Sequence, residues 1–416
     1  MITGIAKCGM RYAVKKSGNA VAYCALSTRC GTRDEAGFHS GIAHFTEHTI
    51  FKGTSHKSAT TINRYLDKLG GELNAYTTKE ELVLHATVLK EDLKKAESLL
   101  MELATCPKFP QKAIDTEKGV VIDEIQSYKD SPADDVYDKF EEKLFAGHPL
   151  SNPILGTSRT VSKINTEELK QFNSEKFRPE VMAFTVVADK DEKHLEKEVL
   201  QLIEKYFPAE EQIQPLTGHR PETDEHYFTP PLNHFDEEVE KRNHEVNAVI
   251  GGLAPSLYEE KERLTTILMS NILAGPVANS ILNEILREKN GWVYNVESSY
   301  TQYSDTGILA ICLGCDRSNL SKCLTAVKKE ILKLQTIPLT ETKLKAAKKQ
   351  LFGQIAISSD NLESQCLSMG KSLLSYGEVM SDEEMKEKIN SITPEDIRDI
   401  TCRIFSPENT SRLIFL

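Results

Sequence analysis

Two parts of the chain repeat the same order of predicted elements, and this repeat limits the fold more than any other feature. Each part begins with an alternating apolar run typical of a strand, at residues 21–27 and again at 246–253. In each part a helix that is stopped by glycine then precedes a strand, at 66–70 and at 286–291. The first part of the chain thus predicts the layout of the second.

The correspondence continues through two more predicted helices in each part. The first part has apolar helical periodicity at 91–104 and 111–129, and the second has it at 318–334 and 341–358. Chance could align two amphipathic helices, but it does not explain a shared order of strands and helices. We interpret the chain as an internal duplication.

A polar segment with four prolines, residues 210–233, interrupts the periodic pattern between the two parts. It predicts an N-terminal domain at 1–209, a linker at 210–233 and a C-terminal domain at 234–416. A chain of 416 residues also exceeds the size that one core normally supports. The predicted class is α+β, with two homologous α/β-sandwich halves, each a mixed, mainly antiparallel sheet covered by helices.

Composition excludes several classes of function. The net charge is −11 and no run of Lys and Arg occurs, so we expect no nucleic-acid partner. No apolar run approaches the roughly 20 residues that a membrane span needs, so we expect no membrane partner. The nine cysteines show no framework of spacings and fit reduced thiols. Because the first residues also lack a signal-peptide pattern, we expect a cytoplasmic protein.

The pentapeptide at 44–48, with the pattern HxxEH, carries the first sign of chemistry. On a helix, His44, Glu47 and His48 share one face. Two imidazoles at this spacing can hold one zinc ion, and the glutamate between them can accept a proton from water. The alternative is a solvated helix face with two histidines, and a third ligand is needed to decide.

The predicted helix at 111–129 offers that third ligand. Glu117 and Glu124 are seven residues apart, two helical turns, and therefore lie on one face. Two solvated glutamates on a surface helix are the alternative, and the residues alone favour it.

Five motifs in order resemble the pitrilysin and mitochondrial processing peptidase family of HxxEH zinc peptidases, the inverzincins. The similar segments are 41–48, 51–54, 70–77, 117–124 and 286–294, so the resemblance spans nearly the whole chain. The length is similar to the short, bacterial-type form of the processing peptidases.

The resemblance implies one Zn²⁺ per chain. His44, His48 and Glu124 would be the ligands, and Glu47 would be the general base. Glu117 would be a second acidic residue near the metal that supports catalysis.

Four further residues acquire substrate-binding roles through the same resemblance. Arg287 and Tyr294 would donate hydrogen bonds to the substrate carbonyl or to the developing oxyanion. Without the family they would be a helix-terminal cation and a half-buried strand residue. Asn74 and Ala75 lie on a strand that would pair with an extended peptide, and a plain sheet strand is the alternative.

The second half lacks the metal ligands. When Ile114 is aligned with Leu344, Glu124 faces Gln354. The resemblance implies an endopeptidase that acts on peptides or unfolded segments and forms a homodimer, or a heterodimer with a related subunit. Alternatives are a non-catalytic, peptide-binding core subunit of such a heterodimer, which the intact HxxEH opposes, and an enzyme that matures one peptide precursor.

Overall fold

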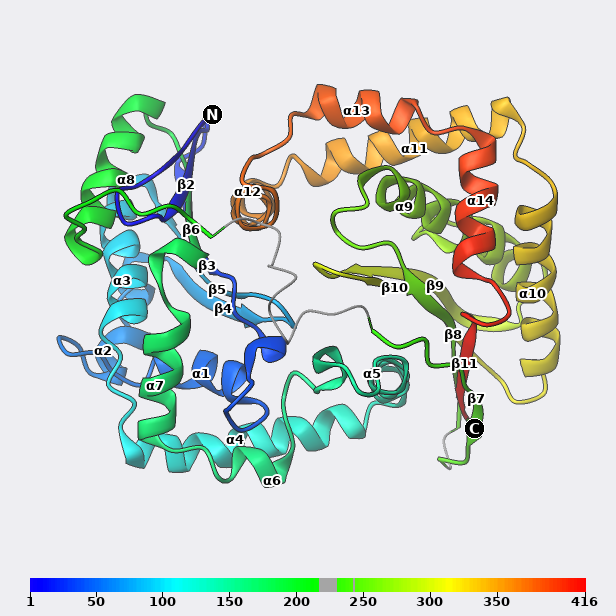
Figure 1. The fold of residues 1–416 in the computed structure, drawn as a ribbon, viewed down its shortest axis with the longest axis horizontal. Helices are drawn as coiled ribbons and strands as arrows, with labels where there is room; N and C mark the ends of the chain where they lie inside the picture. The colour runs from blue at the N-terminus through cyan, green and yellow to red at the C-terminus, as the bar shows by residue number, and fades with distance from the viewer. Residues whose placement is uncertain (217–229, 242–243) are drawn as a thin grey trace. The chain divides into compact units, whose positions relative to one another are not determined.

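The computed structural model describes residues 1–216, 230–241 and 244–416. They form two compact units, each assembled from separate parts of the chain (Figure 1). Unit 1 comprises the described residues of Met1–Ile125, Asn152–Arg220 and Ile357–Met380. Unit 2 comprises those of Gln126–Ser151, Pro221–Ala356 and Ser381–Leu416.

Unit 1 contains a six-stranded sheet in the order β1-β2-β6-β3-β5-β4. Strands β2 and β6 are parallel, and the other neighbours are antiparallel. The strands are β1 (Ile2–Ile5), β2 (Arg11–Lys16), β3 (Val21–Thr28), β4 (Glu72–Thr77), β5 (Leu82–Leu89) and β6 (Met182–Ala188). Strand β4 therefore lies at an edge and pairs with only one described strand.

Helices cover both faces of this sheet. Helices α3 (Leu93–Thr105) and α8 (Glu192–Tyr206) pack on one face over the largest core of the unit, and α12 (Leu362–Tyr376) packs on the other. The remaining helices of unit 1 are α1 (Ile42–Ile50), α2 (Ala59–Asn63), α4 (Gln111–Lys129, to residue 125), α6 (Ser158–Val161) and α7 (Thr166–Lys176).

Unit 2 contains a five-stranded sheet in the order β7-β11-β8-β10-β9. The strands are β7 (Asp236–Val239), β8 (Val246–Ala254), β9 (Val293–Gln302), β10 (Gly307–Cys315) and β11 (Ser411–Phe415). Helices α9, α10 and α14 surround one core, and α5 covers a second. The helices are α5 (Pro132–Leu144), α9 (Glu260–Ala274), a π-type helix η6 (Asn283–Lys289), α10 (Leu320–Thr336), α11 (Glu341–Ser358), α13 (Asp382–Asn390) and α14 (Pro394–Ile404).

The two sheets share one topology. Strands β2, β6, β3, β5 and β4 follow each other in the same order and relative directions as β7, β11, β8, β10 and β9. Strand β1 is an addition in unit 1. The predicted fold class is confirmed, and the repeated order is what an internal duplication produces.

Each unit receives one covering helix from the other half of the sequence. Helix α12, from the C-terminal half, packs on the sheet of unit 1, and α5, from the N-terminal half, packs on the sheet of unit 2. The predicted domain limits follow the chain continuously, whereas the compact units do not. The predicted linker lies partly outside the described residues, so its extent stays a prediction.

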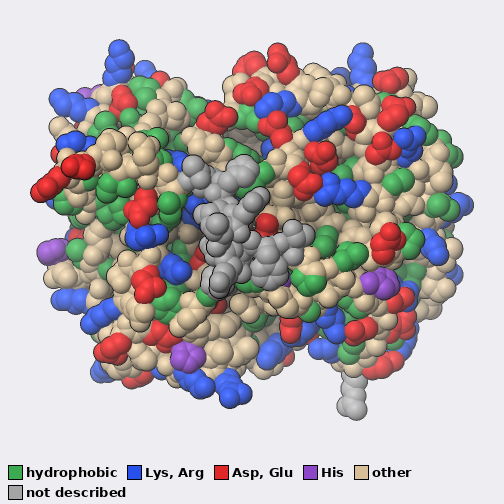
Figure 2. All heavy atoms as spheres, viewed as in Figure 1, with side chains coloured by type: hydrophobic (Ala, Val, Ile, Leu, Met, Phe, Trp, Pro, Cys, Tyr) green, Lys and Arg blue, Asp and Glu red, His purple; other side chains and the backbone are tan. Residues whose placement is uncertain are grey.

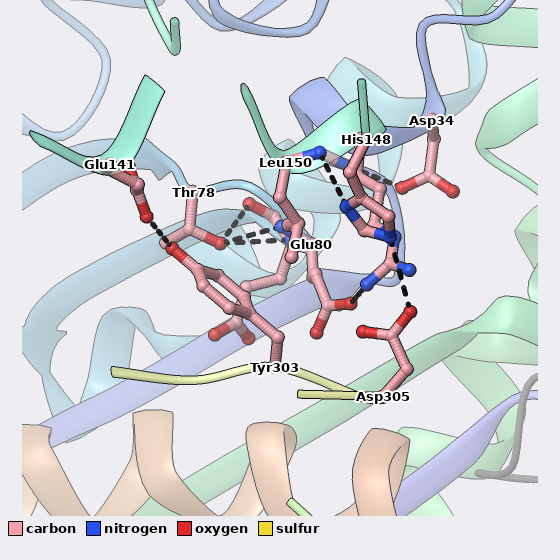
Figure 3. Close-up of polar contacts among 11 residues, drawn as sticks. Asp34, Thr78, Glu80, Glu141, His148, Leu150, Tyr303 and Asp305 are labelled. Atoms are coloured by element: carbon pink, nitrogen blue, oxygen red, sulfur yellow. Dashed lines mark hydrogen bonds and ion pairs between the residues drawn. The ribbon is translucent and has the colours of Figure 1, made fainter. Parts of the chain in front are cut away.

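Polar contacts hold α5 and the loop that follows it, to Leu150, within unit 2 (Figure 3). The hydroxyl of Tyr303, in the turn between β9 and β10, donates to the carboxylate of Glu141 on α5. His148 Nε2 lies 3.6 Å from Asp305 Oδ2 in the same turn, and His148 Nδ1 accepts the N–H of Leu150 at 3.2 Å. These contacts supplement the apolar packing of Val136 and Phe140.

Most predicted elements are confirmed. The helices predicted at 111–129 and 341–358 are α4 and α11 with those bounds. The segment at 66–70 is shorter than predicted, since only a 3₁₀ turn, Asp67–Leu69, forms before Gly70, whose φ is +68°. That positive φ favours glycine, which explains why a glycine marks the end of this segment in the sequence.

The surface agrees with the mixed composition. On the face seen in Figure 2, acidic and basic side chains are interspersed over both units. Among the described helices, none has the length and apolar character needed to cross a bilayer.

Close approach of α12 to the sheet generates a stability prediction. Gly370 of α12 is buried, and a Cβ there would lie 2.5 Å from Ser27 Oγ on β3. We expect Gly370→Val to lower the free energy of unfolding by about 1–3 kcal/mol more than Gly353→Val does, because overpacking displaces the helix. Gly353 is also helical but has nothing within 4 Å of its Cβ position, so it controls for helix propensity. Equal losses in chemical denaturation would contradict this packing.

Candidate metal centre

Helix α1 begins at a tight junction that accepts only glycine. Gly41, its N-cap residue, has a φ of +92°, and a Cβ there would lie 2.8 Å from the carbonyl oxygen of Leu155. A side chain would therefore meet both backbone strain and a clash.

A buried carboxylate caps this helix. Glu35 accepts the N–H of Gly41 at 2.9 Å and the N–H of Ala43 at 3.0 Å. Burial raises the pKa of Glu35 to about 8, and the two N–H donors oppose this rise. The cap satisfies first-turn donors that would otherwise lack partners, and so fixes the start of the helix.

One side of α1 is apolar and packs on α4. Ile42 and Phe45 are fully buried in a core that they share with Ile114, Val121 and Ile125 of α4. His44, Glu47 and His48 lie on a different face of α1 from Ile42 and Phe45, as the helical period requires. The core thus sets the distance between the HxxEH helix and the helix with the two glutamates.

Three side chains that the family resemblance implies as ligands lie close together in the structure. Glu124 Oε2 lies 3.8 Å from His44 Nε2 and 3.4 Å from His48 Nε2. Ligand atoms of the three residues all lie within 4.8 Å of one another. Bonds of about 2.0–2.2 Å to a tetrahedral zinc ion place ligand atoms roughly 3.3–3.6 Å apart, so the two distances from Glu124 lie in or near this range and the donor set suits zinc.

The environment favours the metal-binding form of His44. Burial, and to a smaller extent the neighbouring His48, lowers the pKa of His44 to about 3. A neutral imidazole is the form that coordinates a metal. His44 Nδ1 is buried and has no hydrogen-bond partner among the described residues.

Glu117 contacts one ring nitrogen of His48, and Glu124 lies near the other. Glu117 Oε1 lies 3.0 Å from His48 Nδ1, and its Oε2 lies 2.7 Å from Lys52 Nζ. A carboxylate at Nδ1 holds the proton there and leaves Nε2 free as a ligand. Glu117 therefore orients His48, and Lys52 in turn anchors Glu117.

Glu47 lies between the two histidines and is hydrogen-bonded from the sheet. Thr77, the last residue of β4, donates its hydroxyl to Glu47 Oε2 at 2.6 Å. Burial raises the pKa of Glu47, while the hydrogen bond from Thr77 lowers it.

Asn74 and Ala75 lie on β4, next to α1. Asn74 is exposed and is paired in register with His85, whereas Ala75 is half-buried against the main core. The outer side of β4 has no described strand, and the pairing of this edge with a peptide stays a prediction.

Arg287 and Tyr294 belong to unit 2, and their substrate-binding roles stay predictions. Arg287 lies on η6 and is exposed. Tyr294 is 57% exposed, and its hydroxyl donates to Asp316 Oδ1 at 2.8 Å, which raises the pKa of Tyr294.

Three residues of the site were not assigned a role by sequence reasoning. Lys52 and Thr77 lie inside quoted motifs, but only tertiary contacts show what their side chains touch. Glu35 precedes α1 by seven residues, outside the usual N-cap position, so no local capping signal identifies it.

Comparisons with known proteins agree with this geometry. Residues 11–158 match the model of the insulinase family, peptidase family M16, and residues 163–351 match the M16 inactive domain. The chain is 29% identical to an uncharacterized zinc protease of Streptomyces coelicolor over 89% of this chain and 79% of that protein. It is 27% identical to one of Bacillus subtilis, over 92% and 90%.

Two solved structures share the fold. A protease from Helicobacter pylori has a TM-score of 0.87 at 18% identity and covers all of this chain with 98% of its own length. A peptidase M16 inactive domain from Pseudomonas fluorescens has the same TM-score and identity, with 97% of its length covered.

Replacing the carboxylate ligand tests the donor set. We expect purified protein to carry about one zinc per chain, and Glu124→Gln to lower this content because an amide is a weaker, uncharged ligand. Zinc is measured by elemental analysis after dialysis. The control, Asp123→Asn, changes an exposed neighbour on α4. Full zinc retention in Glu124→Gln would remove Glu124 from the site.

Proposed function

Because the chain belongs to peptidase family M16, we propose that it is a zinc-dependent endopeptidase that hydrolyses peptides or unfolded polypeptide segments. One observation carries the proposal. His44, His48 and Glu124 converge to within 4.8 Å, and Glu47 lies on the same helix between the two histidines. The zinc proteases among the relatives support the same chemistry.

His44, His48 and Glu124 would hold the ion. When bound, zinc would supply Lewis-acid chemistry, which polarises a carbonyl oxygen and makes a water molecule more acidic. Glu47 would accept the proton of the attacking water and later return it to the leaving amine. Its Oε2 accepts the hydrogen bond from Thr77, which leaves Oε1 to take that proton.

Substrate would bind by strand addition. The outer edge of β4, including Asn74 and Ala75, can pair with an extended peptide through backbone hydrogen bonds. Such pairing would give a preference for peptides and unfolded segments, since folded proteins rarely present a free extended backbone. Arg287 and Tyr294 would donate hydrogen bonds to the substrate carbonyl as charge develops there.

A non-catalytic peptide-binding subunit is the alternative. It would keep the edge strand but would not need a proton acceptor beside the metal. Here Glu47 is present on the same helix as His44 and His48, which favours the enzyme.

We further propose that the protein forms a dimer with a second copy or a related subunit, as the short family form implies. We also propose a cytoplasmic location, because the spacing of the nine cysteines fits reduced thiols better than a disulfide framework.

The general base is tested by an isosteric change. We expect Glu47→Gln to keep zinc but lower kcat by roughly 100- to 10,000-fold, because an amide cannot accept the proton. Hydrolysis of a quenched fluorescent peptide library measures the loss, and Glu91→Gln, at an exposed position, is the control. Loss of zinc together with activity would refute the assigned role.

The substrate-binding arginine is tested against a neighbouring cation. We expect Arg287→Ala to lower kcat/KM by roughly 100-fold or more with unchanged zinc content, because it removes a donor to the developing oxyanion. Lys289→Ala removes an exposed cation from the same helix and should leave kcat/KM unaltered. Equal effects of the two variants would mean that Arg287 contributes only its surface charge and has no specific role in binding the substrate.

A further inference from the structure

Thr77 stands where the edge strand meets the HxxEH helix. It is the last residue of β4, and α1 packs against this strand. Its hydroxyl donates to Glu47 Oε2 at 2.6 Å, and no other residue of the described ranges donates a hydrogen bond to that carboxylate. Among the described residues, this contact is the one hydrogen bond that orients the Glu47 carboxylate.

A threonine at a strand end also has a purely structural explanation. β-Branched residues favour strands, and Thr77 is half-buried, so its methyl group could serve packing alone. Two features argue for more. The hydroxyl contacts a carboxylate at a short distance, as charge-assisted hydrogen bonds do. Branching also restricts χ1, which holds the hydroxyl in place before substrate arrives.

We propose that Thr77 is a positioning residue for the general base, an inference that rests on the proposed function. Its hydroxyl holds Glu47 Oε2, so that Oε1 is the oxygen that accepts the proton. Because Thr77 closes the strand to which the peptide would add, it also ties the position of the base to the strand that holds the substrate. Glutamate has several rotatable bonds, and without this contact the carboxylate samples orientations that do not accept the proton.

The test compares Thr77→Val, which removes only the hydroxyl, with Thr77→Ser, which keeps it. A hydrogen bond to a charged group corresponds to roughly a 10- to 100-fold change, so we expect Thr77→Val to lower kcat by about that factor while KM stays constant. Thr77→Ser should retain activity within about threefold, because its hydroxyl still reaches Glu47 but rotates more freely.

A matched control exists on the neighbouring strand. Thr87 of β5 is also half-buried, and its hydroxyl donates to the carboxylate of Glu363 at 3.3 Å. Thr87→Val thus deletes the same type of contact away from the site and should leave kcat unchanged. Zinc content and thermal unfolding are measured for all three variants, and we expect zinc to stay at the wild-type level.

Each outcome of these measurements either supports or overturns the proposal. If Thr77→Val is as active as wild type, or if Thr77→Ser loses as much as Thr77→Val, the positioning role is wrong. A loss of zinc or a rise in KM that accounts for the whole effect would also overturn it. If wild type itself shows no zinc-dependent hydrolysis, the proposed function fails first, and this outcome is separate from the others.

Discussion

The packing of α1 on α4 is the constraint on which the candidate site depends. His44 and Glu124 are 80 residues apart in the chain, and a shared core that includes Ile42, Phe45 and Val121 brings their helices together. The Glu35 cap fixes the start of α1, and Thr77, at the end of the edge strand β4, donates a hydrogen bond to Glu47 of the same helix. A metal site requires ligand atoms placed within tenths of an ångström, so rigid surroundings of this kind are needed before any ion binds.

Sequence reasoning predicted the parts of the site that depend on local spacing. The HxxEH face follows from helical period, and the bounds of α4 follow from apolar periodicity, so both were readable. The side chain of Glu117 was placed on the correct face, but its contact with His48 required the tertiary structure. The Thr77 contact joins residues distant in sequence, and so does the packing of α5 and α12 on the sheet built mainly from the other half of the chain. No local sequence pattern indicates such pairings.

The two halves share one strand order, but the metal ligands occur in the first half alone in the predicted alignment. Both sheets keep one strand order, so the fold tolerates the loss of the metal ligands in the second half. In the predicted alignment Gln354 stands where the first half has Glu124, and an amide offers no negative charge to a cation. Strand β9 remains an edge strand in unit 2, as β4 is in unit 1. The proposed function therefore depends on a few side chains placed on a repeated scaffold.

The central claim is that one zinc ion is bound by two helices of unit 1. Anomalous diffraction at the zinc absorption edge, from crystals of the wild-type protein, tests it directly. We expect one strong peak per chain, about 2.0–2.2 Å from His44 Nε2, His48 Nε2 and a carboxylate oxygen of Glu124. A peak at other residues, or a peak at the two histidines with Glu124 turned away, would contradict the claim.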